Sequence, residues 1–192
     1  MAKTDRGVQM KEILKDSLCY LMGAMDNAPD QGKGWRRWLI EECKARGLKI
    51  KFLDPTNKVS GLQSEVEEER KKIVTLKSQE KWDELAQMMK TVVRQDHSCI
   101  DFSDFVICYL DVSVHTCGSY FELQSALTEK KPYFIVVTGG KKLVPAWLFG
   151  VCDHRYFFDD LSQVVEYLSD LNAGNRELSD RWVLIRKQIK DL

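Results

Sequence analysis

The sequence predicts an α/β domain in which a parallel sheet is covered by helices on both faces. Apolar runs of strand length alternate along the chain with stretches of helical periodicity, and this alternation is typical of parallel sheets. One of these runs, "FVICYL" within residues 104–111, is apolar without a break, as expected for a central strand buried on both faces. The chain has 192 residues, enough for one domain, 1–192, with a full core.

The first two strands and the helix between them follow from local patterns. Residues 17–23, "SLCYLMG", form a short apolar run that ends in glycine and is predicted to be a buried strand. Residues 34–47 place tryptophans, a leucine and a cysteine on one face, and Gly47 supplies the helix stop. Residues 48–55 alternate and then turn at Pro55, as a strand does.

Two further helices are expected before the third strand. Residues 56–78 are charged, with helical spacing at Val66, Ile73 and Leu76. Residues 79–95 give a clearer helix, because six apolar side chains share one side. We interpret residues 56–98 as a helical insertion in the domain.

The second half of the chain repeats the strand and helix alternation. The elements predicted after residues 104–111 are a helix at 119–129, a strand at 132–140, a short helix in "VPAWLFG", a strand at 155–160, a helix at 161–171 and a final amphipathic helix at 177–192.

Composition excludes several classes of function. The chain carries 29 basic and 29 acidic residues, and this lack of a basic excess argues against a nucleic-acid partner. The sequence contains no run of about 18 apolar residues, so no membrane span is expected. Its first residues are polar and lack the apolar core of a signal peptide. The six cysteines show no CxxC pairing, so we expect buried or half-buried free thiols in a reducing cytoplasm, and no metal site.

Polar residues follow each of the first four predicted strands. The segments are "GAMDNAPDQGKGW", "DPTNK", "DVSVHTCGS" and "TGGKK". Because ligands of open α/β sheets bind beyond the carboxyl ends of the strands, these segments define the expected site. The usual phosphate motifs fail: there is no GxxxxGK[ST], and "GKGWRR" has Arg37 where a dinucleotide fingerprint has its third glycine.

Glu122, in "GSYFELQSALTEKKPYFIVV", allows two interpretations. The spacing Ser119-Tyr120-Phe121-Glu122 fits a capping box, with Ser119 as N-cap and Glu122 folding back on it. A carboxylate in the first turn of this helix would also face the crevice, where it could attack an electrophilic carbon.

Four pieces of the sequence together resemble the nucleoside 2-deoxyribosyltransferase family and its sister branch, the 2′-deoxynucleoside 5′-monophosphate N-glycosidases. The pieces are "CYLMGAMDN", "KFLDPTNK", "SDFVICYLD" and "GSYFELQSALTEKKPYFIVV", and the match covers about residues 17–170. The resemblance implies a Rossmann-like three-layer sandwich with a five-stranded parallel sheet of flavodoxin-like order. The chain departs from the pattern at Gln124, where the family has glycine.

The resemblance also implies catalytic roles. Glu122 is expected to be the nucleophile, Tyr20 the aromatic residue that orients it, and Asp104 the acidic residue that contacts or protonates the base. From the residues alone, Tyr20 could be a core tyrosine and Asp104 a loop cap. Substrate contacts are expected at Gly23, Asp26, Asn27, Asp54, Asp111, Gly118, Ser119 and His154; the loop residues Asp26 and Asn27 also fit ordinary turn chemistry.

His154 belongs to "FGVCDHRYF", which resembles the stretch that reaches into a neighbouring subunit's site. The transferase pattern has Asp-Asn where this chain has Asp153-His154. A histidine there could bind a 5′-phosphate, which would favour the nucleotide branch. The resemblance thus implies a homo-oligomer with shared sites.

The expected activity is cleavage of the N-glycosidic bond of a 2′-deoxynucleoside through a covalent deoxyribosyl-glutamate, with transfer to another nucleobase. Hydrolysis of a 2′-deoxynucleoside 5′-monophosphate is one alternative, and a non-catalytic nucleotide-binding module is another. No cofactor is expected, since the carboxylate itself carries the chemistry.

Overall fold

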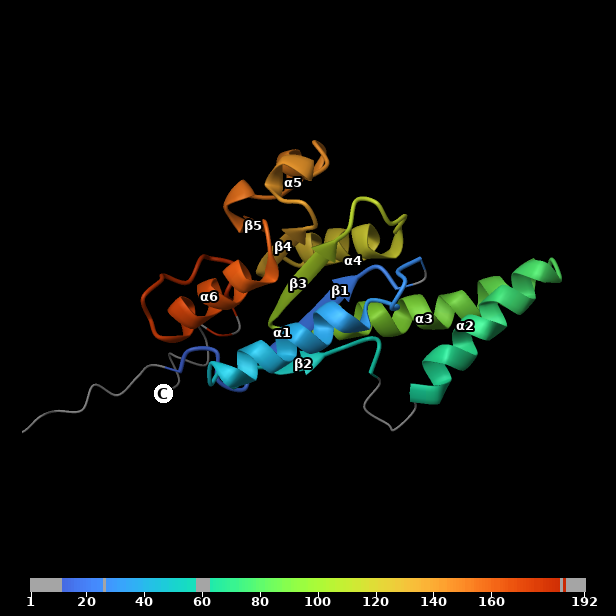
Figure 1. Ribbon diagram of the computed structural model, residues 1–192, viewed down its shortest axis with the longest axis horizontal. Helices are drawn as coiled ribbons and strands as arrows, with labels where there is room; N and C mark the ends of the chain where they lie inside the picture. The colour runs from blue at the N-terminus through green and yellow to red at the C-terminus, as the bar shows by residue number, and fades with distance from the viewer. Residues whose placement is uncertain (1–11, 26, 58–62, 184, 186–192) are drawn as a thin grey trace, which may run out of the picture.

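The computed structural model describes residues 12–25, 27–57, 63–183 and 185, and it contains the predicted sheet. The five strands are β1 (Leu18–Gly23), β2 (Lys51–Leu53), β3 (Phe105–Leu110), β4 (Tyr133–Val137) and β5 (Phe157–Phe158). All neighbours pair in parallel, in the order β2-β1-β3-β4-β5. The α/β class, the five strands and the flavodoxin-like order are confirmed (Figure 1).

Helices cover both faces of the sheet and bury a separate apolar core on each. Helices α1 (Lys33–Ala45) and α6 (Leu161–Asn172) pack on one face. Helices α3 (Trp82–Phe102), α4 (Gly118–Thr128) and α5 (Leu148–Val151) pack on the other. Strand β3 contributes to both cores, since Phe105 and Ile107 face α1 and α6 while Val106 and Cys108 face α3 and α4. A strand buried on both faces explains the unbroken apolar run.

Helix α2 (Gln63–Ser78) and helix α3 form a hairpin that extends beyond the sheet (Figure 1). The connection turns at Glu80, which has a positive φ of 54°. Helix α3 runs to Phe102, beyond the predicted end at residue 95, because Ile100 at its far end is fully buried against the sheet. That the hairpin is an insertion stays a prediction.

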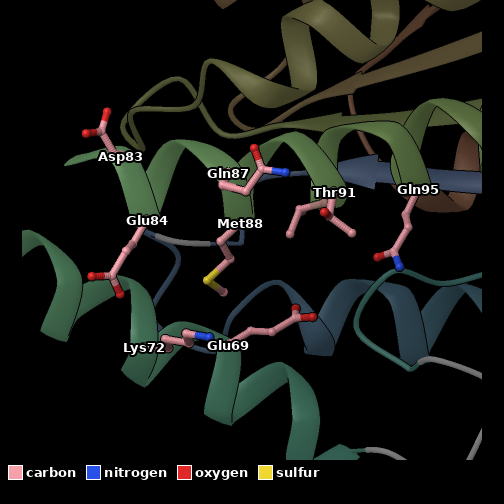
Figure 2. Close-up of a pocket in the computed structure, with 9 residues that line it drawn as sticks. Glu69, Lys72, Asp83, Glu84, Gln87, Met88, Thr91 and Gln95 are labelled. Carbon is pink, nitrogen blue, oxygen red and sulfur yellow. The ribbon is translucent and has the colours of Figure 1, made fainter. Parts of the chain in front are cut away.

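A hollow lies between α2 and α3, and Figure 2 shows its lining. The labelled side chains are mostly polar or charged, and include Glu69 and Lys72 from α2 and Asp83 and Glu84 from α3. Such a surface suits solvent rather than an apolar ligand. Glu69 also lines the pocket that is described below.

The last predicted helix is wrong over its first six residues. Residues 177–182 form no helix, and the described helical residues there are Val183 and Ile185. The chain leaves the helical path because the Trp182 ring packs against Phe105 and Phe134 in the core beneath α6. Residues 186–192 of this prediction lie outside the described residues.

Two short 3-10 turns flank the end of the sheet. They are η1 (Lys141–Leu143) and η2 (His154–Tyr156), and the second occupies the first two residues of the strand predicted at 155–160, of which Phe157 and Phe158 form β5. Within the described residues, we find no helix with the length and apolar character that crossing a membrane requires.

Candidate active site

A pocket of about 380 Å³ opens at the carboxyl end of β1 and the amino end of α4. Its size is within the range of small-molecule sites, and its position is the crevice predicted for a parallel sheet. It is lined by the loop after β1, the turn after β2, the turn before α4 with the first residues of that helix, and the facing sides of α2 and α3. The lining residues are Gly23, Met25, Asn27, Gln31, Pro55, Glu69, Arg70, Ile73, Lys77, Met89, Val92, Val93, Asp96, His115, Thr116, Cys117, Gly118, Ser119 and Glu122.

Glu122 and Tyr20 are joined at this pocket by a hydrogen bond. The Tyr20 hydroxyl donates to Glu122 Oε1 over 2.8 Å. Tyr20 is fully buried in the middle of β1, so the position of its hydroxyl is fixed by the sheet. Glu122 is partly buried and lines the pocket. The structure thus brings these two predicted residues together.

The capping-box interpretation of Glu122 is wrong. The N-cap of α4 is Cys117, with no side-chain cap, and Glu122 is the fifth residue of the helix rather than part of its first turn. The Ser119 hydroxyl pairs with the hydroxyl of Thr116 at 2.9 Å. The Glu122 carboxylate is therefore directed to Tyr20 and the pocket instead of the helix start.

Opposing effects act on the ionisation of Glu122. Burial raises the pKa of its carboxyl above the usual range, while the Tyr20 hydrogen bond and the positive charge of Arg36 lower it. The pKa of Tyr20 is raised far above its usual value, first by burial and then by the charges of Glu122 and Asp96. Tyr20 consequently stays protonated and remains a hydrogen-bond donor to the carboxylate.

The loop after β1 meets the turn before α4 across the pocket. The Asn27 amide donates to the backbone oxygen of His115 over 2.8 Å. Gly23 has no room for a side chain, since an added Cβ would lie 2.9 Å from the Tyr109 carbonyl oxygen and 3.0 Å from the Trp35 ring. Gly23, Asn27, Gly118 and Ser119 all line the pocket as predicted positions, whereas Asp26 lies outside the described residues.

Asp54 and Asp111 organise turns beside the pocket but do not line it. Asp54 Oδ1 accepts from the backbone nitrogen and hydroxyl of Thr56, and lies 3.6 Å from Arg36 Nε. Asp111 Oδ1 accepts from the backbone nitrogen and hydroxyl of Ser113. Direct substrate contact by either residue remains a prediction.

Asp104 lies at the amino ends of the strands, whereas the pocket opens at their carboxyl ends. Its carboxylate accepts from the Leu18 backbone nitrogen over 2.7 Å, and its own backbone nitrogen donates to the Leu18 carbonyl oxygen. Both residues stand at the amino ends of their strands, β3 and β1. The structure therefore corrects the base-contacting role predicted for Asp104, because the pocket opens at the carboxyl ends.

His154 is also away from this pocket in the single chain. It lies in η2, where the Lys141 amine is 3.3 Å from its Nδ1 and donates to its backbone oxygen. Its predicted role is in the site of a neighbouring subunit, and it stays a prediction.

Sequence reasoning missed two charged groups of the site. Asp96 lines the pocket from α3, in the segment 56–98 that we interpreted as a helical insertion. Its spacing from Val92 and Val93, which share that pocket face, is the signal that could have indicated it. Arg36 is fully buried behind the loop after β1, and a charged residue in an amphipathic helix gives no sequence sign of burial. Cys117, expected to be buried or half-buried, is exposed at the pocket.

These features define the class of the protein as an α/β domain with a flavodoxin-like sheet and a Tyr–Glu pair in its carboxyl-end pocket. A scan of protein-family models and a search of curated proteins give no match.

Solved structures are similar in shape at low identity. A 2-deoxyribosyltransferase from Bacillus psychrosaccharolyticus is 13% identical with a TM-score of 0.51, over 79% of this chain and 92% of that one. The resemblance inferred from the sequence is thus confirmed at the level of the fold.

Two more distant structures share less of the shape. A CMP N-glycosidase from Clostridium botulinum is 16% identical with a TM-score of 0.44, over 81% of this chain and 98% of that one. A conserved protein from Enterococcus faecalis V583 is 16% identical with a TM-score of 0.43, over 92% and 99%. Neither is close enough in shape to support an inference.

Proposed function

We propose that this protein cleaves the N-glycosidic bond of a 2′-deoxynucleoside, with Glu122 as the nucleophile, and transfers the sugar to another nucleobase. The observation that carries the proposal is the 2.8 Å hydrogen bond from the buried Tyr20 hydroxyl to a carboxylate that lines the pocket. A capping carboxylate would bond to its own helix, and Glu122 does not. The fold shared with a 2-deoxyribosyltransferase supports the proposal.

The reaction proceeds in two displacements at C1′ of the sugar. A Glu122 oxygen attacks C1′ as the bond from C1′ to the base nitrogen breaks, and the bonding electron pair leaves with the base, which takes up a proton. A nitrogen of an incoming base then attacks C1′, loses its proton and releases the Glu122 carboxylate. The Tyr20 hydroxyl holds the attacking carboxylate in place during the first step.

Asp96 is our candidate for the group that exchanges the proton with the base. It lines the same pocket as Glu122, and its charge acts on the Tyr20 hydroxyl. A positioned acid or base contributes about 10²–10⁴-fold to such a step. Asp96 replaces Asp104 in this role because Asp104 is held at the amino ends of β1 and β3, away from the pocket.

The α2–α3 wall of the pocket suits a nucleobase. Its apolar side chains are Ile73 from α2 and Met89, Val92 and Val93 from α3, and Met25 lies on the loop after β1. A planar base has two apolar faces and a polar edge, and it suits a pocket with apolar walls and a small number of polar groups. The turn His115–Ser119, with its hydroxyls and backbone groups, suits the sugar.

Hydrolysis of a 2′-deoxynucleoside 5′-monophosphate is the second candidate function. It is favoured by two basic residues of α2, Arg70 and Lys77, which line the pocket and could pair with a phosphate. Water would then take the place of the incoming base at C1′, and the products would be free base and deoxyribose 5-phosphate.

The test is a base-exchange assay with a panel of deoxynucleosides and their 5′-monophosphates, each with and without a free acceptor base. We expect exchange with the wild type and a loss of several orders of magnitude in Glu122→Gln, which keeps the shape but removes the attacking charge. The matched control is Glu166→Gln, the same change at an exposed site on α6 over the opposite face of the sheet. Binding without turnover of any compound would instead indicate a nucleotide-binding module.

A further inference from the structure

Arg36 is a fully buried cation that ties together three segments of the site. Its Nε donates to the Leu21 carbonyl oxygen over 3.2 Å, its Nη1 to Gly32 over 2.9 Å and its Nη2 to Gly23 over 3.1 Å. Leu21 and Gly23 belong to β1, the strand that carries Tyr20. Gly32 ends the loop from which Met25, Asn27 and Gln31 line the pocket.

The guanidinium is also paired on its other sides. Asp54 Oδ1 lies 3.6 Å from Nε, and this carboxylate holds the turn after β2 through Thr56. The guanidinium carbon lies 4.5 Å from the centre of the Trp35 ring, which stacks on Tyr109 at the end of β3. One side chain therefore fixes the ends of β1 and β2 and the loop between β1 and α1.

Titratable and charged groups from each surrounding element act on Glu122 or on Tyr20, or line the pocket. They are Tyr20 of β1, Cys108 of β3, Asp96 and Cys99 of α3, Arg36 of α1, and along the pocket wall Glu69, Arg70, Lys77 and His115. Arg36 has no exposed surface, so water screens its positive charge less than it screens the charge of an exposed cation. Arginine also stays protonated under all ordinary conditions.

We propose that Arg36 is a positioning residue of this site: it fixes the pocket loop and the end of β1 through its three carbonyl contacts, and its buried positive charge favours the ionised form of the Glu122 carboxylate. A nucleophilic carboxylate must be ionised to attack, and burial alone opposes that state. The inference deepens the proposed function, but its electrostatic part concerns the free protein and can be tested without any substrate.

The test is a carboxyl ¹³C NMR titration of glutamate-labelled protein, with the Glu122 signal identified by its absence in Glu122→Gln. In Arg36→Met we expect the Glu122 midpoint to rise, because the ionised carboxylate loses an opposite charge that lowers its pKa. The matched control is Arg37→Met, the same change at the adjacent exposed position, which should leave the midpoint in place. An unchanged midpoint in folded Arg36→Met would overturn the proposal.

A second variant covers the case in which Arg36→Met does not fold. Asp54→Asn removes the counter-charge and keeps the guanidinium, so the Glu122 midpoint should fall. A change in the opposite direction to that of Arg36→Met separates a charge effect from loosened packing. A midpoint that rises or stays constant in Asp54→Asn contradicts the proposal.

Arg36→Lys separates the charge from the loop contacts, and this arm rests on the proposed activity. Lysine keeps the positive charge but not the planar fork that reaches three carbonyl groups. The Glu122 midpoint should stay near that of the wild type while KM rises more than kcat falls. A loss confined to kcat would show that the loop contacts do not position the substrate.

Discussion

Replacing Tyr20 by phenylalanine removes one oxygen atom and leaves the packing of β1 unchanged. The lost bond is the 2.8 Å donation to Glu122, between a fully buried hydroxyl and a partly buried carboxylate. A hydrogen bond to a charged group contributes about 1.5–3 kcal/mol. At about 1.36 kcal/mol per pKa unit, its loss should raise the pKa of Glu122 by about one to two units. We expect the lower end, because Glu122 keeps contact with the pocket solvent.

The assay is the pH dependence of kcat/KM, which reports the ionisation of the free enzyme. Activity requires ionised Glu122, so the acid limb of the profile should move to higher pH in Tyr20→Phe. The control is Tyr133→Phe, since Tyr133 is also buried and its hydroxyl accepts from the Asp153 backbone nitrogen at 2.7 Å, remote from the pocket. If the acid limb stays in place, or moves equally in the control, the orienting role of Tyr20 is refuted.

Three further predictions follow from the geometry. Asp104→Ala should lower the free energy of unfolding by about 1–2 kcal/mol in chemical denaturation, because the Leu18 nitrogen loses its acceptor. The same variant should leave kcat nearly unchanged, and a large loss of kcat would restore the catalytic role of Asp104. Asp96→Asn should lower kcat/KM by about 10²–10⁴-fold for natural bases and far less for a nitrophenyl deoxyriboside, whose leaving group needs no proton; equal losses would exclude a proton-transfer role. Gly32→Ala should lower the melting temperature more than Gly47→Ala, although both glycines have φ near +70°. A Cβ at Gly32 would collide with Arg36 Nη1 and would lie 2.5 Å from the Ala24 carbonyl oxygen, whereas a Cβ at Gly47 meets nothing within 4 Å. Equal losses in the two variants would show that the loop at Gly32 shifts to admit the methyl group.

The fold could be predicted because its signals are local. The alternation of apolar runs and helical stretches specifies each element, and the rule for parallel connections then leaves few topologies. The unbroken run of β3 indicated a central strand, and the structure places it between β1 and β4. The final helix failed because Trp182 packs on Phe105 and Phe134, a contact between distant segments that periodicity does not carry.

The Tyr20–Glu122 pair was predicted from the family resemblance and not from local periodicity, because neither residue stands at the end of its strand or helix. Tyr20 and Glu122 lie 102 positions apart, and the order of the strands brings them together. Asp104 was expected to contact the base at the pocket, but it directly precedes β3 and therefore lies at the amino end of the strand, one strand length from the pocket. Arg36 was missed because its partners are backbone carbonyls, which leave no pattern in a sequence.

The most direct measurement is the capture of a covalent sugar on Glu122. The protein is mixed with a deoxynucleoside, quenched in acid during turnover and digested, and the peptides are sequenced by tandem mass spectrometry. The account predicts a deoxyribosyl group on the peptide that contains Glu122, its removal when free base is added before the quench, and its absence from Glu122→Gln. Two results would contradict the nucleophilic role of this carboxylate: turnover by the wild type without an adduct, or turnover by Glu122→Gln at a near-normal rate.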